Sequence, residues 1–345
     1  MKHLSVYLLI IPTIVIFSWK NKTFEKQFEN YTELDTTKIV SRIALGSCNG
    51  QDSEQPLWGS ILQNKPDLWI WLGDIVYGDT EDPEFLKEKY TKQKNNPEYQ
   101  KLLNTTPVIG VWDDHDYGKN DGGKEYSMKK ISQQLLLDFL DVPDNAPQRI
   151  REGAYSSYVF GKDNQKIKII LLDVRYFRDS LPKNDARLCN RTGDMLGEEQ
   201  WEWLESELNR TDIQLFIIGN GTQILPTKYP FEKWANFPKS RQRLFDLFKE
   251  HQDKRFLLLS GDLHMGEIAK IKPKGFDSPV YEMTASGLTH FYEKKPRNKY
   301  RIGRPANQLN FGLIEIVWNE NPVKVKLQLR GLNNKLVTEE IVYLK

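Results

Sequence analysis

The strongest fold signal in this chain is the ten-residue stretch Leu68-Trp69-Ile70-Trp71-Leu72-Gly73-Asp74-Ile75-Val76-Tyr77. Its first half is wholly apolar, and a strand that is apolar on both faces belongs in the middle of a sheet covered on both sides. The stretch therefore predicts a buried strand that ends at Gly73. In open α/β sheets, ligands bind outside the carboxyl ends of the strands, so Asp74 and Tyr77 are candidate site residues.

The same pattern, an apolar run followed by glycine or a polar residue, recurs along the chain. The expected strands are 42–46, 68–73, 108–112, 167–173, 215–219 and 256–260, with further strands at 280–285, 311–318, 323–329 and 336–343. Helical spacing of apolar residues predicts helices around 128–140, 201–208 and 244–248. These elements indicate one α/β domain over residues 38–345.

The N-terminus has a different character. Lys2 and His3 precede an apolar run from Leu4 to Trp19, which is the pattern of a secretory signal. The run is short for a spanning helix, which needs about 20 apolar residues. We expect residues 1–25 to be a signal peptide or membrane anchor, with possible membrane association through residues 4–19, and 26–37 to be a linker. The domain would then be secreted, periplasmic or membrane-anchored outside the cytoplasm.

Composition narrows the classes of partner. The 49 basic and 47 acidic residues among 345 leave a net charge of +2, without a long basic block. No specific nucleic-acid binding is therefore expected, and the oligomeric state stays undetermined. Of the two cysteines, Cys48 and Cys189, the first is open to three interpretations: simple burial, a disulfide with the second, or metal ligation.

Polar residues follow five of the predicted strands and should meet at one rim of the sheet. They are Cys48, Asp74, Tyr77, Asp114, His115, Asn220, Asp262 and His264. Crowded carboxylates resist ionisation unless cations neutralise them. Oxygen ligands suit Ca²⁺ or Mg²⁺, whereas thiolate, phenolate and imidazole suit iron or zinc. The set predicts two unlike metals about 3.5–4 Å apart, the arrangement that clamps both oxygens of a phosphoryl transfer.

Several of these residues also have a purely structural alternative. A lone aspartate at a strand end is usually a cap, but His264 follows Asp262 by two, which places both side chains on one face of an extended segment. His115 lies between carboxylates, which would raise its pKa and suit it to general-acid work, although it could instead be a core histidine. Arg175 or Arg178 could grip a phosphate in bidentate fashion or form a structural salt bridge.

Other hydrolase motifs are missing from the sequence. There is no Gly-x-Ser-x-Gly elbow, which disfavours a serine hydrolase. There is also no Gly-x-x-x-x-Gly-Lys loop to cradle a nucleotide phosphate. Metal-assisted chemistry is the mechanism that remains.

Five sequence blocks together resemble the alkaline phosphatase D (PhoD-like) family of the calcineurin-like metallophosphoesterase superfamily. They are Gly46-Ser47-Cys48, Gly73-Asp74-Ile75-Val76-Tyr77, Trp112-Asp113-Asp114-His115-Asp116, Gly261-Asp262-Leu263-His264 and Thr284-Ala285-Ser286-Gly287-Leu288-Thr289-His290. The blocks follow the family order from about residue 40 to 292. The resemblance implies a four-layer αββα sandwich of two mixed β-sheets flanked by helices.

The resemblance also implies a mechanism and its metals. Iron(III) would be held by Cys48, Asp74, Tyr77 and His264, and calcium by Asp74, Asp262 and Asp114, with Asn220 or Asn120 adding a ligand; zinc, manganese or magnesium are alternatives. A metal-bound hydroxide would attack phosphomonoesters or phosphodiesters in line. His115, together with Asp114, would be catalytic. Apart from the resemblance, Arg175 and Asn120 are expected to contact the substrate.

Two rival functions remain, and the chain departs from better-known family members at both ends. The chain could be a catalytically silent metal- or phosphate-binding protein on the same fold, or a phospholipid-directed phosphodiesterase. Better-known family members have a longer N-terminal domain, a twin-arginine signal and, in some, a C-terminal helix over the site. Here residues 311–345 predict strands instead, so a more open site is expected.

Overall fold

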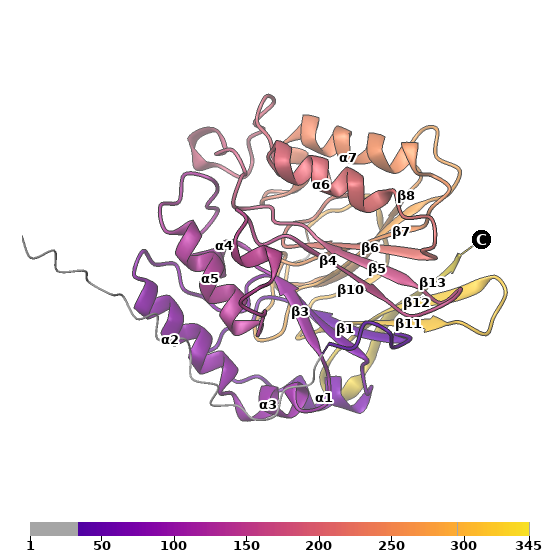
Figure 1. Cartoon of the computed structure of the whole chain (residues 1–345), viewed down its shortest axis with the longest axis horizontal. Coiled ribbons are helices and arrows are strands. Elements are labelled where there is room, and N and C mark those ends of the chain that lie inside the picture. The colour runs from indigo at the N-terminus through magenta and orange to yellow at the C-terminus, as the bar shows by residue number, and fades with distance from the viewer. Residues whose placement is uncertain (1–33, 295, 345) are drawn as a thin grey trace, which may run out of the picture.

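The computed structural model describes residues 34–294 and 296–344, and its strands form two sheets (Figure 1). The first, sheet A, has the order β13 (Leu336–Leu344), β12 (Val323–Arg330), β11 (Phe311–Val317), β1 (Arg42–Gly46), β2 (Leu68–Leu72) and β3 (Val108–Val111). The second, sheet B, has the order β10 (Arg301–Ala306), β8 (Gly266–Ile271), β9 (Val280–Ala285), β7 (Phe256–Ser260), β6 (Leu215–Asn220), β5 (Ile167–Leu171) and β4 (Ser156–Phe160).

Both sheets are mixed. In sheet A, β1, β2 and β3 are parallel, whereas β11, β12 and β13 pair in antiparallel fashion. In sheet B, β5, β6, β7 and β9 are parallel, and β4, β8 and β10 are antiparallel to their neighbours. The parallel strands of each sheet are those whose carboxyl ends carry the polar residues noted in the sequence.

Helices cover the outer faces of both sheets (Figure 1). On the side of sheet A lie α1 (Trp58–Gln63), α2 (Pro83–Lys94), α3 (Pro97–Leu103) and α5 (Lys129–Phe139), and α4 (Asp114–Tyr117) is a single turn after β3. On the side of sheet B lie α6 (Glu198–Leu208) and α7 (Pro238–Glu250). Short 3-10 turns occupy Pro147–Arg149, Pro182–Asn184, Trp234–Asn236 and Leu332–Asn334.

Local sequence explains where α2 and α3 begin. Asp82 accepts hydrogen bonds from the backbone N–H groups of Glu84 and Phe85, and Asn96 caps α3 in the same way. Each cap is followed by a proline, whose fixed φ suits the first helical position and whose missing N–H costs nothing there.

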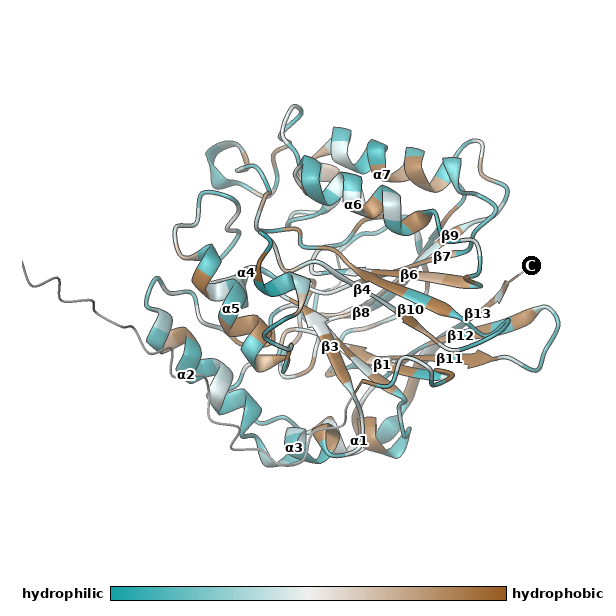
Figure 2. Cartoon of the chain, in the orientation of Figure 1, coloured by the Kyte–Doolittle hydropathy of each residue, from teal (hydrophilic) through white to brown (hydrophobic). Residues whose placement is uncertain are grey.

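Buried apolar side chains fill the space between the two sheets and the space between each sheet and its helices. Trp69 and Trp71 of β2 pack against Trp58 of α1, with ring centroids 5.2 and 5.7 Å away, and all three are fully buried. Aromatic side chains contribute large buried areas, so this cluster fixes α1 on sheet A. Figure 2 shows the apolar strands inside and the polar faces of α6 and α7 turned outward.

The structure confirms the expected two-sheet α/β fold. Each predicted strand and helix is present, with ends shifted by a few residues at most for the strands. The sequence did not reveal β4, β8, β10 and the helices α1 to α4. The predicted signal or anchor, residues 1–25, lies outside the described residues, and none of the described helices is long and apolar enough to span a membrane.

Candidate metal centre

Strand ends from both sheets converge on one cluster of potential metal ligands. Three groups have ligand atoms within 4.8 Å of one another: Cys48, Asp74 and His264; Asp74, Asp114 and His115; and Asp74, Asp113, Asp114 and Asp262. Asp74 belongs to all three groups, so its carboxylate lies at the centre of the cluster. Cys48, Asp74 and three residues in the segment after β3, Asp113 to His115, follow strands of sheet A. Asp262 and His264 follow a strand of sheet B.

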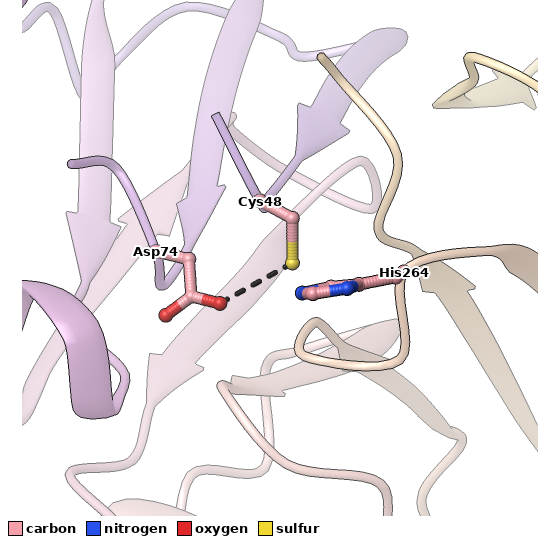
Figure 3. Close-up of side chains that lie close together, drawn as sticks. All are labelled: Cys48, Asp74 and His264. Atoms are coloured by element: carbon pink, nitrogen blue, oxygen red, sulfur yellow. Dashed lines mark hydrogen bonds between the residues drawn. The ribbon is translucent and has the colours of Figure 1, made fainter. Parts of the chain in front are cut away.

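Figure 3 shows the first of these groups. Cys48, Asp74 and His264 come from three separate segments and point toward one another. The Cys48 Sγ lies 3.3 Å from Asp74 Oδ2 and 3.0 Å from Ser286 Oγ. Both cysteines are free, Cys48 being buried and Cys189 exposed, so the disulfide alternative is wrong.

The backbone at this cluster is strained. Cys48, Asp74, Asp262 and His264 have φ values of 57°, 47°, 62° and 54°, in the left-handed region that non-glycine residues rarely occupy. Such a residue costs of order 1–3 kcal/mol and persists where the surrounding structure holds it in place. Four such residues in one cluster indicate that the fold is arranged around this site.

Glycine lets the ends of the two sheets approach each other here. A Cβ on Gly221, after β6 of sheet B, would lie 2.3 Å from the side chain of Asp113. A Cβ on Gly261, after β7, would lie 2.2 Å from the carbonyl oxygen of Leu72 in sheet A. Neither position has room for a side chain, and this close approach brings the carboxylates of both sheets together.

The electrostatics of the cluster call for cations. Burial, and then the charge of neighbouring groups, raises the pKa of Asp74 and of Asp262 well above its usual range. Burial also raises the pKa of the Cys48 thiol to about 12. The Oδ1 atoms of Asp74 and Asp114 and the Oδ2 atom of Asp113 are buried and have no hydrogen-bond partner among the described residues. Metal ligation would satisfy these oxygens and stabilise the thiolate, so the residues fit the two-metal interpretation.

Tyr77 joins the cluster through its hydroxyl group. Its oxygen lies 3.3 Å from His264 Nε2 and 3.5 Å from Asp74 Oδ2. It also lies 2.8 Å from Nε2 of His290, a residue in the fifth sequence block that was not predicted as a ligand. Burial lowers the pKa of His290 to about 4, so this imidazole is neutral near pH 7, the form that binds metals.

His115 is paired with an acid that the sequence did not single out. Its Nδ1 lies 2.6 Å from Asp79 Oδ2. Burial opposes protonation, but the hydrogen bond to Asp79 and the charges of Asp74 and Asp114 outweigh it and raise the pKa of His115 to about 10. The histidine is therefore protonated at neutral pH in the metal-free protein. Asp79 follows Tyr77 by only two residues, and this closeness in sequence to a predicted ligand was the one feature that could have identified Asp79 as a site residue.

Arg175 forms the structural salt bridge that the sequence allowed. Its side chain is 1% exposed. Nε donates to Asp113 Oδ1 at 2.6 Å, Nη1 donates to Glu232, and Nη2 lies 3.7 Å from Asp114 Oδ1. Arg178 pairs with the same Glu232. Nη2 of Arg175 also donates to Thr222 Oγ1 at 3.4 Å. These contacts are those of the structural salt bridge, and the substrate-binding role of Arg175 stays a prediction.

The two predicted asparagines, Asn220 and Asn120, are not among the grouped ligands of the cluster. Asn220 is buried at the end of β6, and its Oδ1 accepts hydrogen bonds from Trp234 Nε1 and the Thr222 N–H at 3.0 and 3.1 Å. Both lone pairs of that oxygen are therefore engaged, and a metal bond would have to replace one of these contacts. Asn120 is exposed in the loop after α4. The ligand and substrate roles of both asparagines remain predictions.

A second layer of polar side chains orients the ligands. Asp116 accepts hydrogen bonds from the backbone N–H groups of Asp113, Asp74 and Ile75 at 2.7, 3.2 and 3.1 Å, and so fixes the ends of β2 and β3 together. Ser286 accepts the His264 N–H at 2.9 Å. Outer contacts of this kind tune a metal site nearly as strongly as the ligands do.

Comparisons with known proteins identify a family and a fold. The family model described as PhoD-like phosphatase matches residues 43–313. A solved structure of PhoD is 15% identical, covers 91% of this chain and 70% of its own, and has a TM-score of 0.72. GAP50, described as the anchor in the inner membrane complex of Plasmodium, is also 15% identical, with coverages of 89% and 90% and a TM-score of 0.57. At this identity the two structures show the fold alone. The sequence matches no curated protein.

Proposed function

The chain belongs to the PhoD-like phosphatase family, a family of metal-dependent phosphoesterases, and we propose that it hydrolyses phosphomonoesters, phosphodiesters or both at a dinuclear site. The observation that carries the proposal is the position of Asp74, whose buried carboxylate is shared by all three potential ligand groups and retains an oxygen without a hydrogen-bond partner among the described residues.

The donor types divide the cluster between two ions. Cys48, Tyr77 and His264 would hold iron(III) together with Asp74, because thiolate, phenolate and imidazole suit that metal. Asp74, Asp114 and Asp262 would hold calcium, or else zinc, manganese or magnesium. The neighbouring carboxylate of Asp113 and the neutral imidazole of His290 are further candidates that the structure adds.

The bound metals would polarise the phosphoryl oxygens and acidify water. His115 would supply the proton that the departing ester oxygen requires, since it is held protonated beside the cluster by Asp79. Asp114 would keep its orientation through the backbone N–H of Asp121, which donates to its Oδ2 at 2.7 Å. Arg175 would hold Asp113 in place.

The site of action follows from the N-terminal pattern. A basic start and a short apolar run at residues 4–19 support export, with the domain outside the cytoplasm and with or without a retained membrane anchor. We propose no nucleic-acid partner, because the charge balance of +2 leaves no long basic block.

The test is hydrolysis of p-nitrophenyl phosphate and of bis(p-nitrophenyl) phosphate by the purified chain, before and after chelation and metal reloading. We expect turnover that chelation abolishes and that Asp74→Ala removes without unfolding the protein. Asp246→Ala, at an exposed position on α7, is the matched control and should retain full activity. Undiminished turnover in Asp74→Ala would overturn the site assignment.

The same experiment separates the rival functions. Stoichiometric metal binding without turnover of either ester would support a catalytically silent protein. Turnover of phosphatidylcholine vesicles well above that of the soluble diester would instead support a phospholipid-directed enzyme. If both soluble esters are hydrolysed, the ratio of the mono- and diester rates shows whether the chain is mainly a phosphomonoesterase or a phosphodiesterase.

A further inference from the structure

Three aromatic side chains form a continuous row that starts at the candidate metal centre. Phe231 is stacked on Tyr292 with ring centroids 5.3 Å apart and an interplanar angle of 9°. Tyr229 contacts Phe231 edge-on at 5.1 Å. We refer to Tyr229, Phe231 and Tyr292 as the aromatic strip.

The strip is joined directly to a candidate ligand. The Tyr292 ring lies 4.8 Å from the ring of His264, and the Tyr292 N–H donates to the His264 carbonyl oxygen at 2.8 Å. The hydroxyl oxygen of Tyr229 is buried and has no hydrogen-bond partner among the described residues. The strip therefore lies against the candidate metal centre, where a phosphoryl group would be held.

The strip is held in a fixed position. Glu232, next to Phe231, is buried and forms ion pairs with Arg175 and Arg178. Arg175 also forms an ion pair with Asp113 of the candidate metal centre. The Tyr292 carbonyl accepts a hydrogen bond from Asn307 Nδ2 at 3.1 Å. A rigid aromatic surface loses little conformational entropy when a ligand settles on it, which favours recognition.

The strip also retains free surface. Phe231 is 38% exposed and Tyr292 39% exposed, although both are large apolar rings. Packing of the fold does not require two exposed aromatic rings to be stacked beside a polar cluster. Flat rings attract other flat rings by offset or edge-to-face contact, and one stacked base contributes about 1–3 kcal/mol.

We propose that the aromatic strip is a subsite for a planar aromatic group esterified to the substrate phosphate, such as an aryl or nucleobase-bearing ester. The inference rests on the proposed function, because the phosphate must lie at the metal centre for its ester group to reach the strip. Esters of small aliphatic alcohols would bind the same centre without this additional contact.

The test compares two inert phosphonates, phenylphosphonate and methylphosphonate, by calorimetry on the metal-loaded full chain. We expect the wild type to bind phenylphosphonate about tenfold more tightly, which corresponds to one stacking contact of about 1.4 kcal/mol. Phe231→Leu and Tyr292→Leu keep an apolar side chain but remove the flat ring, and each should reduce the preference to about threefold or less. The affinity for methylphosphonate should stay unchanged.

Phe85→Leu is the matched control, because Phe85 is 40% exposed on α2 outside the strip, and it should keep the wild-type preference. Equal affinity for both phosphonates in the wild type, or an unchanged preference in both strip variants, would overturn the proposal while p-nitrophenyl phosphate turnover leaves the proposed function standing. Binding of neither phosphonate would overturn the proposed function and the strip together.

Discussion

Replacing Arg175 by methionine tests the buried ion pairs behind the metal centre. The side chain is 1% exposed, and the carboxylates of Asp113 and Glu232 that face it are 0% and 2% exposed. Methionine is unbranched and carries no charge, so it would leave the buried carboxylate of Asp113 without its cation and leave Glu232 with Arg178 alone. Burial already raises the pKa of Asp113 to about 7 despite the opposing charge of Arg175, and the loss of Arg175 would raise it further.

The magnitude follows from the burial of all partners. Removing one member of a buried ion pair costs about 3–5 kcal/mol, because the remaining charge is left uncompensated. With about 2.1 cal/mol/K of unfolding entropy per residue, the 345-residue chain should lose about 4–7 °C in Tm. Phosphate binding should weaken much less than stability, since Arg175 is buried and donates to the carboxylates of Asp113 and Glu232.

Thermal unfolding followed by circular dichroism, with and without metals, provides the measurement. The matched control is Arg243→Met, which removes a bidentate pair with Glu198 whose side chains are 38% and 66% exposed. Exposed pairs contribute about 0–1 kcal/mol, so this Tm should shift by about 1 °C or less. If Arg175→Met does not fold, Arg175→Lys, which keeps the charge, should fold with an intermediate Tm. Equal shifts in Arg175→Met and Arg243→Met would refute the reasoning.

Three further predictions concern the site itself. In the metal-free protein, burial raises the pKa of Asp113 to about 7 and of Asp116 to about 8. The folded state then favours the protonated forms of both carboxyl groups, so their contribution to stability is complete below pH 4 and is lost as the pH rises through 7–8. Urea titrations of the metal-free protein should therefore give a lower free energy of unfolding at pH 9 than at pH 5. Asp79→Asn removes the partner that raises the pKa of His115, so the alkaline limb of the kcat profile should move to lower pH, and an unmoved limb contradicts the proton-donor role. Cys48→Ser should weaken iron retention by about tenfold or more while calcium is kept, as metal analysis after dialysis would show, and equal iron contents would argue against thiolate ligation.

The part of the fold that the sequence predicted is the part with continuous apolar runs. Trp69-Ile70-Trp71-Leu72 could only be a strand buried on both faces, and the structure places it as β2 in sheet A between β1 and β3. By contrast, β10 reads Arg301-Ile302-Gly303-Arg304-Pro305-Ala306 and is only partly buried, so no apolar period marks it. Its place comes from antiparallel pairing with β8, a long-range contact that no local pattern encodes.

The candidate site was predictable to a similar extent and for a similar reason. Cys48, Asp74 and His264 each follow an apolar strand, and such strand ends meet at one edge. Asp79 and His290 carry no such signal, because their positions depend on loops that fold back toward His115 and Tyr77. The role of Arg175 was undecidable from sequence, since its partner Glu232 lies 57 residues away.

The ligands of the candidate centre are divided between the two sheets, and this division has a consequence for the life of the protein. Cys48 and Asp74 extend from sheet A, and Asp262 and His264 from sheet B. Ions held between them would join the two halves of the molecule, so the free energy of metal binding would also be cohesion between the halves. A cell short of the metal would then accumulate a looser protein that proteases cut more readily. Metal supply would set how much of this protein persists as well as how fast each copy works.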